Sequence, residues 1–275
     1  MSYLGIDIGG TKILAQLFDD QLKLKKEVLK KTIHKSEASF IKELFEIIES
    51  LLDRSVKGIG IAVPGTVDIR TGTIIKAPHL PLRKNYPMGE MLKKKFKLPI
   101  WVDHDINAFL FAETRDSKRK KWNEAIGVMI GTGVGGALMI KGELFYGAKG
   151  LAGEVGHMIQ HPGDKYPTVE HRLGGCYLNK RLKDLKINPK NEKAISKLLL
   201  SDMQILLTNL NWVFAPEVMI LGGSMYHHYL QKSKKEIAEF IAKHSHNGKS
   251  PILLDGQKKP QVAKGVVMLL LKNHF

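Results

Sequence analysis

The stretch GVMIGTGVGGALMIKGELFYGAKGLAGEVGH, residues 127–157, decides how the rest of the chain is interpreted. It holds ten glycines among 31 residues, yet apolar residues at strand spacing run through it. The apolar runs on either side of Gly131-Thr132-Gly133 predict a hairpin whose connection lacks bulky side chains. Glycine lets the backbone approach a ligand closely and point N–H groups at an anion. The stretch therefore predicts an anion-binding hairpin or, as the alternative, an ordinary glycine-rich one.

The same stretch ends with a carboxylate and an imidazole three residues apart, Glu154 and His157. Side chains of these two types can hold neighbouring hydroxyl groups of a polyol. The alternative is a buried pair that satisfies itself inside the fold. Taken alone, the spacing supports the polyol-binding and the buried-pair hypotheses equally.

Length and composition indicate a globular protein. The 275 residues suit one large or two moderate domains, and 43% of them are apolar and 25% charged. No apolar run approaches the roughly 18 residues of a membrane span, and the N-terminus lacks the layout of a signal peptide. Cys176 is the single cysteine, so the chain cannot form an intramolecular disulfide. We expect a cytoplasmic protein with no membrane partner.

The net charge of +16 raises the question of nucleic-acid binding. The lysines are dispersed, their clusters are not interleaved with aromatic residues, and no helix-turn-helix or zinc-finger pattern is present. The charge therefore predicts a solvated, lysine-rich surface that favours anionic substrates, and no nucleic-acid partner.

A second glycine turn lies near the start of the chain. An apolar strand at residues 3–8 carries Asp7 near its end, and Gly9-Gly10-Thr11-Lys12 joins it to a strand at residues 13–18. A turn between two strands differs from a Walker loop, which joins a strand to a helix. Backbone N–H groups and the Thr11 hydroxyl can face a phosphate there, with Lys12 nearby. The alternative is an ordinary tight turn.

A polar cluster follows the strand predicted at residues 98–102. Asp103, His104, Asp105 and Asn107 come at the carboxyl end of that strand, where open α/β sheets bind ligands. The alternative for Asp105 is a capping role for the helix predicted from residue 108.

The order of predicted elements indicates two α/β domains with a cleft between them. The lysine-rich connection at residues 115–121 is the expected boundary. We expect a smaller domain of residues 1–115, completed by the closing helix 262–275, and a larger domain of residues 116–261.

Together these pieces resemble the ROK family of sugar kinases and repressors, within the hexokinase and actin-like ATPase superfamily. The resemblance covers nearly the whole chain, and the motifs occur in the family's order. They are DIGGTK at 7–12, AVPG at 62–65, APHLP at 77–81, HDIN at 104–107, GTGVGG at 131–136, GEVGH at 153–157 and LGG at 221–223. The resemblance implies two RNase H-like (actin-like ATPase) domains with an interdomain cleft.

The resemblance also implies an activity, which is ATP-dependent phosphorylation of a hexose hydroxyl with ATP and Mg²⁺ as cofactors. Glucose at its 6-position is the first expectation. The alternatives are N-acetylmannosamine, N-acetylglucosamine, fructose or allose as substrate, or a non-catalytic sugar-binding protein. Family repressors carry a winged helix ahead of the first strand, which begins here at residue 3, so we do not expect a repressor. Dimerisation is common in the family, and a homodimer is possible.

Residue roles follow by position. Asp105 is the implied general base, and Asp7 is implied to bind Mg²⁺ through water. The implied sugar contacts are His79, His104, Asn107, Glu154, His157 and Glu170. The implied phosphate and nucleotide contacts are Asp7, Gly9, Gly10, Thr11, Lys12, Gly131, Thr132, Gly133, Gly222 and Gly223.

The chain departs from the family pattern in two places. Many members bind zinc through a histidine and a CxCGxxGC run, whereas residues 169–176 are VEHRLGGC. His157, His171 and Cys176 could supply three ligands where a structural zinc needs four, so we expect no zinc. The stretch resembles instead the ExxLSG of zinc-free bacterial glucokinases, in which the glutamate contacts glucose. The second departure is His79 and His104, where the family usually has asparagine. A changed substrate or tolerant structural positions would both explain it.

Overall fold

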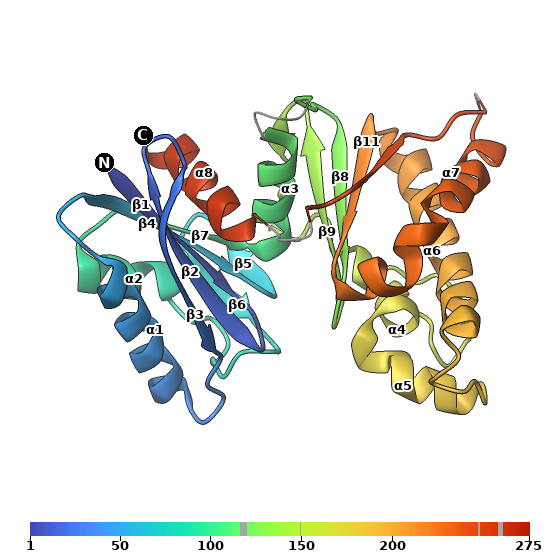
Figure 1. Cartoon of the computed structure of the whole chain (residues 1–275), viewed down its shortest axis with the longest axis horizontal. Coiled ribbons are helices and arrows are strands. Elements are labelled where there is room, and N and C mark those ends of the chain that lie inside the picture. Colours follow the sequence, from blue (N-terminus) through green and yellow to red (C-terminus); the bar gives the residue numbers. More distant parts are fainter. Residues whose placement is uncertain (116–119, 149, 247, 258–260) are drawn as a thin grey trace. The chain divides into compact units, whose positions relative to one another are not determined.

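The computed structural model describes residues 1–115, 120–148, 150–246, 248–257 and 261–275. The chain divides into two units, each with its own sheet and core (Figure 1). The N-terminal unit comprises Met1–Arg119, Tyr146–Leu151 and Lys259–Phe275, and the C-terminal unit comprises Lys120–Phe145 and Ala152–Lys258. The sequence prediction placed all of 116–261 in the larger domain, whereas the short segment from Tyr146 clusters with the N-terminal unit.

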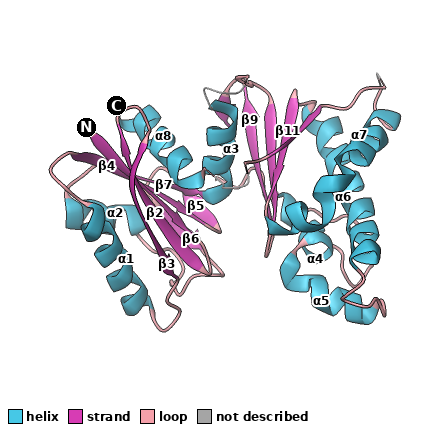
Figure 2. Cartoon of the chain, in the orientation of Figure 1, coloured by secondary structure: helices cyan, strands magenta, loops and turns pink. Residues whose placement is uncertain are grey.

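The N-terminal unit is a five-stranded mixed sheet in the order β3-β2-β1-β4-β7 with helices on both faces (Figure 2). The first three strands are antiparallel, and β4 and β7 continue parallel to β1. A small hairpin, β5–β6, and helix α2 complete the unit. The bounds are β1 Ser2–Ile8, β2 Lys12–Asp19, β3 Leu24–Lys31, α1 Glu37–Leu51, β4 Val56–Val63, β5 Thr66–Asp68, β6 Thr73–Lys76, α2 Met88–Phe96, β7 Ile100–His104, α3 Asp105–Arg115 and α8 Val262–His274.

Alternation along β1 explains the two layers of helices. Leu4 and Ile6 are buried in the same cluster as Phe40 of α1, whose first turn is closed by a capping box at Ser36. The intervening side of β1 faces α8, where Tyr3 packs with the last helix. Period-two alternation in a strand and an apolar stripe on a helix thus build this core.

The C-terminal unit is a five-stranded sheet in the order β10-β9-β8-β11-β12. Strands β8, β11 and β12 are parallel, so their carboxyl ends share one edge, while β9 and β10 are antiparallel additions. The apolar face of the sheet packs against helices α4, α6 and α7. The bounds are β8 Ala125–Ile130, β9 Val134–Ile140, β10 Glu143–Leu144, α4 Val169–Leu173, α5 Gly175–Asp184, α6 Glu192–Phe214, β11 Val218–Gly222, α7 Lys234–Lys243 and β12 Ile252–Asp255.

Several elements differ from the sequence prediction. Helix α3 begins at Asp105, so Asn107 lies in its first turn instead of ahead of it. The residues compared above with a zinc-binding run form α4 and α5. Between β11 and α7 the chain forms a π-helix, Tyr226–Leu230, and a 3₁₀ turn, Gln231–Ser233.

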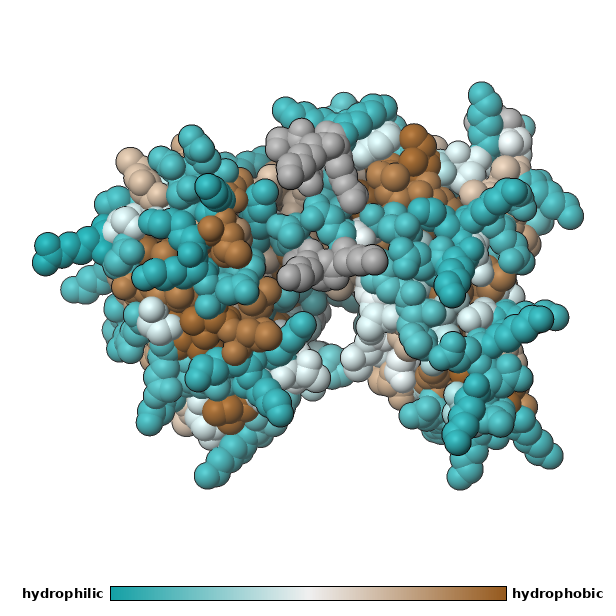
Figure 3. Space-filling model, in the orientation of Figure 1, coloured by the Kyte–Doolittle hydropathy of each residue, from teal (hydrophilic) through white to brown (hydrophobic). Residues whose placement is uncertain are grey.

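The surface agrees with the high lysine content. Polar side chains cover most of the face seen in Figure 3. Strand β3, at the edge of its sheet, has the sequence LKKEVLKK and no buried residue. Lysines on an edge strand discourage pairing with another sheet. Within the described residues, no helix combines the length and apolar character needed to cross a bilayer.

Contact between β1 and α8 requires glycine at position 5. A Cβ atom added to Gly5 would lie 2.0 Å from the carbonyl oxygen of Ala263 in α8. We predict that Gly5→Ala lowers the free energy of unfolding by about 2 kcal/mol or more, because overpacking forces the helix away from the sheet. Urea denaturation measures the change. Lys26→Ala, on the exposed strand β3, should cost less than about 0.5 kcal/mol. Equal stabilities for the two variants would contradict this account of the contact.

Candidate active site

The glycine turn between β1 and β2 is anchored from one side. The carbonyl oxygen of Gly9 accepts from Thr32 Oγ1 at 2.7 Å, that of Gly10 lies 2.6 Å from His34 Nε2, and that of Thr11 accepts from the Thr32 N–H at 3.0 Å. In a planar trans peptide the C=O and the following N–H point in opposite directions. The N–H groups of Gly10 and Thr11 therefore point away from the segment at 32–34, as an anion-binding turn requires.

The glycine turn between β8 and β9 has the same construction. The carbonyl oxygens of Gly131 and Thr132 accept from the N–H groups of Gly175 and Cys176 at 2.9 Å each. Those donors are the first two residues of α5. The N–H groups of Thr132 and Gly133 consequently point away from the start of α5. This turn is held by the start of a helix, whereas the first turn is held by the segment that follows β3.

Gly222 and Gly223 lie beside this second turn, at the carboxyl end of β11. Gly223 has a φ of +94°, and a Cβ atom there would lie 2.3 Å from the carbonyl oxygen of Ile130, the residue before Gly131. Only glycine fits this backbone conformation and this approach. The structure thus brings together two of the glycine groups singled out in the sequence.

Asp105 opens helix α3 directly after β7, and its side chain is partly exposed. Its Oδ1 accepts from the N–H of Ile106 at 2.7 Å. The capping alternative and the catalytic hypothesis are compatible here, because the carboxylate is at the helix N-terminus and still reaches solvent. The positive end of the helix dipole stabilises a negative charge at this position.

The neighbouring Asp103 is the buried centre of a hydrogen-bond network, and the sequence analysis assigned it no functional role. It has no exposed surface, and its two carboxylate oxygens accept four hydrogen bonds. The donors are Trp101 Nε1 at 3.1 Å, the His104 N–H at 2.7 Å, Asn107 Nδ2 at 2.9 Å and the Tyr146 hydroxyl at 2.7 Å. Burial raises the pKa of the Asp103 carboxyl, while these hydrogen bonds and nearby His104 oppose the rise.

The Asp103 carboxylate orients the side chain of Asn107. Because a carboxylate only accepts hydrogen bonds, the amide nitrogen of Asn107 faces Asp103, and its carbonyl oxygen is the atom left to accept from a ligand. Tyr146 reaches Asp103 from the segment that follows β10. Its position within the glycine-rich stretch was visible in the sequence, but its pairing with Asp103 was not.

The two unusual histidines lie in different surroundings. His104 is 7% exposed, and its Nε2 accepts from the Val67 N–H at 3.1 Å, which links β7 to β5. That contact supports the structural alternative for position 104. His79 is exposed and lies against the first glycine turn, since a Cβ atom added to Gly10 would lie 3.0 Å from the His79 Cβ.

Glu154 and His157 do not form the buried pair that was the alternative in the sequence. Their side chains are 34% and 76% exposed, with 3.8 Å between Glu154 Oε2 and His157 Nε2. Glu170, from α4, accepts from the N–H of Val134 at 3.0 Å through Oε2, directly after the second glycine turn. The structure therefore joins Glu170 to that turn within the C-terminal unit.

The described residues contain no group of three His, Cys, Asp or Glu side chains placed to hold a metal ion. The Nδ1 of His171 lies 2.9 Å from Thr168 Oγ1, and its ring packs edge-on against Tyr177. Partial desolvation, with nearby Glu170, raises the pKa of the exposed Cys176 thiol, which opposes the thiolate form that zinc binds. These residues do not fit a zinc site.

Comparison with known proteins identifies the family of the chain. A sequence model described as the ROK family matches residues 3–180. An N-acetyl-D-glucosamine kinase from Salmonella newport is 34% identical over 158 residues, which are 57% of this chain and 52% of that protein. The chain thus matches about half the length of this relative.

Solved structures match over the full length. A putative N-acetylmannosamine kinase from Listeria monocytogenes superposes with a TM-score of 0.87 at 20% identity, covering 100% of both chains. A ROK family glucokinase from Streptomyces griseus, in complex with glucose and AMPPNP, gives a TM-score of 0.79 at 21% identity, covering 99% of this chain and 100% of that one. These matches confirm the predicted two-domain α/β fold.

The raised pKa of Asp7, near the end of β1, makes a testable contribution to the pH dependence of stability. Burial raises the pKa of its carboxyl from 3.8 to about 6, and nearby Lys12 opposes the rise. The unfolded chain ionises Asp7 first as pH rises, so the free energy of unfolding falls between about pH 4 and pH 6 and then levels off. The cost at neutral pH is about 2 kcal/mol, allowing for partial solvent access.

We predict that Asp7→Asn stabilises the ligand-free protein by about 2 kcal/mol at pH 7.5 and by almost nothing at pH 3.5. Urea denaturation across this pH range measures the difference. Asp20→Asn, at an exposed position, serves as the control and should leave the pH dependence unchanged. A stability gain that does not vary with pH would refute the assignment.

Proposed function

Because the chain belongs to the ROK family, we propose that it is an ATP-dependent kinase that phosphorylates a hydroxyl group of a hexose. The observation that carries the proposal is the shared construction of the two glycine turns. Each has its carbonyl oxygens occupied by the protein, so successive N–H groups are free to face an anion. Phosphoryl transfer depends mainly on such positioning and on charge stabilisation.

In the proposed reaction, the sugar hydroxyl oxygen attacks the γ-phosphorus of ATP. The bond from that phosphorus to the bridging oxygen breaks, ADP departs with the electron pair, and Asp105 accepts the hydroxyl proton. The first turn, with Thr11 and Lys12, and the second turn, at 131–133, bind the phosphates. Gly222 and Gly223 let the adenosine approach the backbone.

Asp7 fits a role near magnesium. Its partly buried carboxyl has a raised pKa with Lys12 as the opposing charge, and a further cation would stabilise the ionised form. Asp7 would hold Mg²⁺ through water, and the ion would neutralise charge on the β- and γ-phosphates.

The proposed sugar contacts come from exposed or partly exposed side chains and from Asn107, which is 7% exposed. Glu154 and His157 can accept and donate hydrogen bonds to neighbouring hydroxyls, and Asn107 presents its carbonyl oxygen because Asp103 holds its amide nitrogen. Glu170 has its second carboxylate oxygen for the sugar while Oε2 holds Val134. His79 is the remaining candidate at the first turn.

We favour an N-acetylated amino sugar as the substrate over glucose, the first expectation from the sequence. The support is the 34% identity to a kinase named for N-acetyl-D-glucosamine, since the glucokinase match at 21% identity speaks only for the fold. His79, where the family usually has asparagine, is consistent with a substrate other than glucose.

A sugar panel tests the proposed activity. We predict ADP release with N-acetylglucosamine or N-acetylmannosamine at a kcat/KM at least about tenfold above that with glucose, fructose or allose. A coupled ADP assay with ATP and Mg²⁺ measures it. Faster turnover of glucose would restore the glucokinase hypothesis. Sugar binding without ADP release would favour a non-catalytic sugar-binding protein.

The general base is tested separately. Asp105→Asn should reduce kcat by at least about 10²-fold while the Kd for the sugar, measured by calorimetry, stays nearly unchanged. The amide keeps the size of the side chain but accepts no proton. Asp20→Asn is the matched control and should keep wild-type turnover. Near-wild-type kcat in the Asp105 variant would show that another group accepts the proton.

A further inference from the structure

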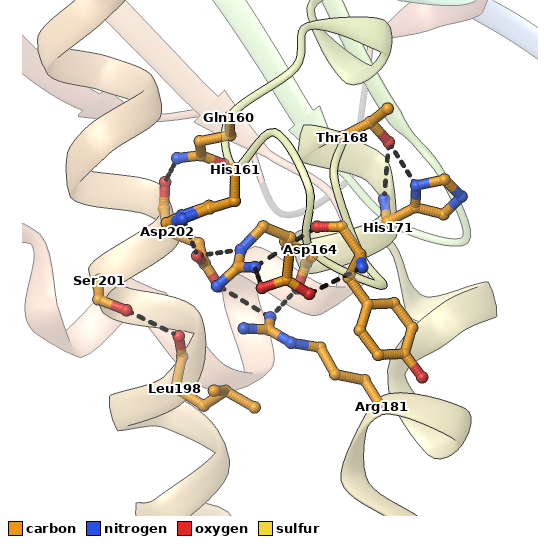
Figure 4. A network of polar contacts seen from close by, with 11 residues as sticks. Gln160, His161, Asp164, Thr168, His171, Arg181, Leu198, Ser201 and Asp202 are labelled. Atoms are coloured by element: carbon orange, nitrogen blue, oxygen red, sulfur yellow. Dashed lines mark hydrogen bonds and ion pairs between the residues drawn. The ribbon is translucent and has the colours of Figure 1, made fainter. Parts of the chain in front are cut away.

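A buried charged cluster in the C-terminal unit is not used by the proposed reaction. We call it the Asp202 cluster, and it consists of Asp202 on α6, Arg172 on α4 and Arg181 on α5. The Asp202 side chain is 1% exposed; its Oδ1 lies 2.5 Å from Arg172 Nε and its Oδ2 lies 2.8 Å from Arg181 Nη1. Figure 4 shows the carboxylate of Asp202 approached by Arg181 and by the loop that carries His161.

The cluster also fixes the loop before α4. Arg172 donates from Nη1 to Asp164 Oδ2 at 3.1 Å, and Arg181 Nη1 donates to the carbonyl oxygen of Arg172 at 2.5 Å. Gln160 Nε2 donates to the backbone oxygen of Asp202 at 2.7 Å. Asp202 of α6 is therefore linked to α4 and the loop by hydrogen bonds and to α5 by an ion pair.

The elements held in this way carry proposed functional groups. Helix α4 contains Glu170, two residues before Arg172, and α5 begins with the N–H groups that hold the carbonyl oxygens of Gly131 and Thr132. Any shift of α4 and α5 relative to α6 therefore moves both the second glycine turn and Glu170.

Stability alone does not account for these charges. A buried ion pair loses the hydration of both partners, and well-packed apolar residues often replace such a pair without loss of stability. Apolar packing is already present around the cluster, with Leu173, Leu182 and Leu199 buried in the same core. Charged hydrogen bonds add what apolar contacts lack, which is a fixed direction and distance.

We propose that the Asp202 cluster positions the second glycine turn and Glu170 for the nucleotide and the sugar, so that Asp202, Arg172 and Arg181 are positioning residues. This proposal rests on the proposed kinase function. On this proposal, apolar contacts are sufficient to maintain the fold of the C-terminal unit. The geometry of the second glycine turn depends in addition on the charged side chains of the Asp202 cluster.

Three variants test the separation. Asp202→Asn removes the charge, and Arg181→Lys keeps the charge but loses the planar guanidinium. The third variant combines Asp202→Leu, Arg172→Met and Arg181→Leu, replacing all the charges by apolar groups. Ile237→Ala, in the same core but on α7, is the control for a general loss of stability.

The readouts are urea denaturation, the Kd for ATP by calorimetry, and KM and kcat with the best sugar of the panel. We expect Asp202→Asn to be destabilised and to raise the Kd and KM for ATP about tenfold, and Arg181→Lys to raise them about threefold. We expect the triple variant to recover stability but not ATP affinity. Ile237→Ala should lose stability with unchanged Kd and KM.

Recovery of both stability and ATP affinity in the triple variant would overturn the positioning role. If the triple variant did not fold, unchanged ATP affinity in Arg181→Lys and Asp202→Asn would overturn the positioning role. Failure of the kinase proposal is distinguishable, because the wild type would then bind ATP but phosphorylate no sugar, and the variants' Kd values would still report on the turn. A wild type without ATP binding would overturn both.

Discussion

Both candidate phosphate sites depend on one geometric constraint, the opposite directions of C=O and N–H in a trans peptide. Once a neighbouring element occupies the carbonyl oxygens of a turn, its N–H groups must face the other way. The N-terminal unit meets this constraint with Thr32 and His34, and the C-terminal unit meets it with the start of α5. Two different contacts thus produce the same backbone arrangement, and in each the arrangement is built by the protein's own hydrogen bonds.

Two buried aspartates support the groups around these turns. Asp103 is saturated by four neutral donors and fixes the orientation of Asn107, whereas Asp202 is paired with two guanidinium groups. Asp103 acts on its neighbours through hydrogen bonds to both carboxylate oxygens, whereas Asp202 combines a hydrogen bond from Arg172 to Oδ1 with an ion pair between Oδ2 and Arg181. A site whose supporting residues are fixed by such bonds loses less entropy when a ligand binds.

Local sequence patterns predicted the parts of the fold that local physics determines. Apolar residues at strand spacing and the glycine turns were sufficient to predict the two hairpins, and the polar cluster after β7 pointed to Asp105. Helices α4 and α5 were not predicted: α4 has only five residues, and Gly174 and Gly175 interrupt the pattern where one helix ends and the next begins. The Asp202 cluster was missed for another reason. Its partners lie 30 and 21 residues from Asp202 in sequence, and no periodic pattern reports on pairings at that range.

The packing of α8 against Gly5 has a consequence for synthesis on the ribosome. Strand β1 emerges from the ribosome well before α8, Val262–His274, the helix that covers one of its faces. Until then, Tyr3 and Phe18 lack the apolar partners Ala263 and Val267 that bury them in the finished unit. The helices and strands of the C-terminal unit are therefore synthesised before α8 can cover this face of the N-terminal sheet, and the apolar surface stays uncovered in the nascent chain until α8 follows.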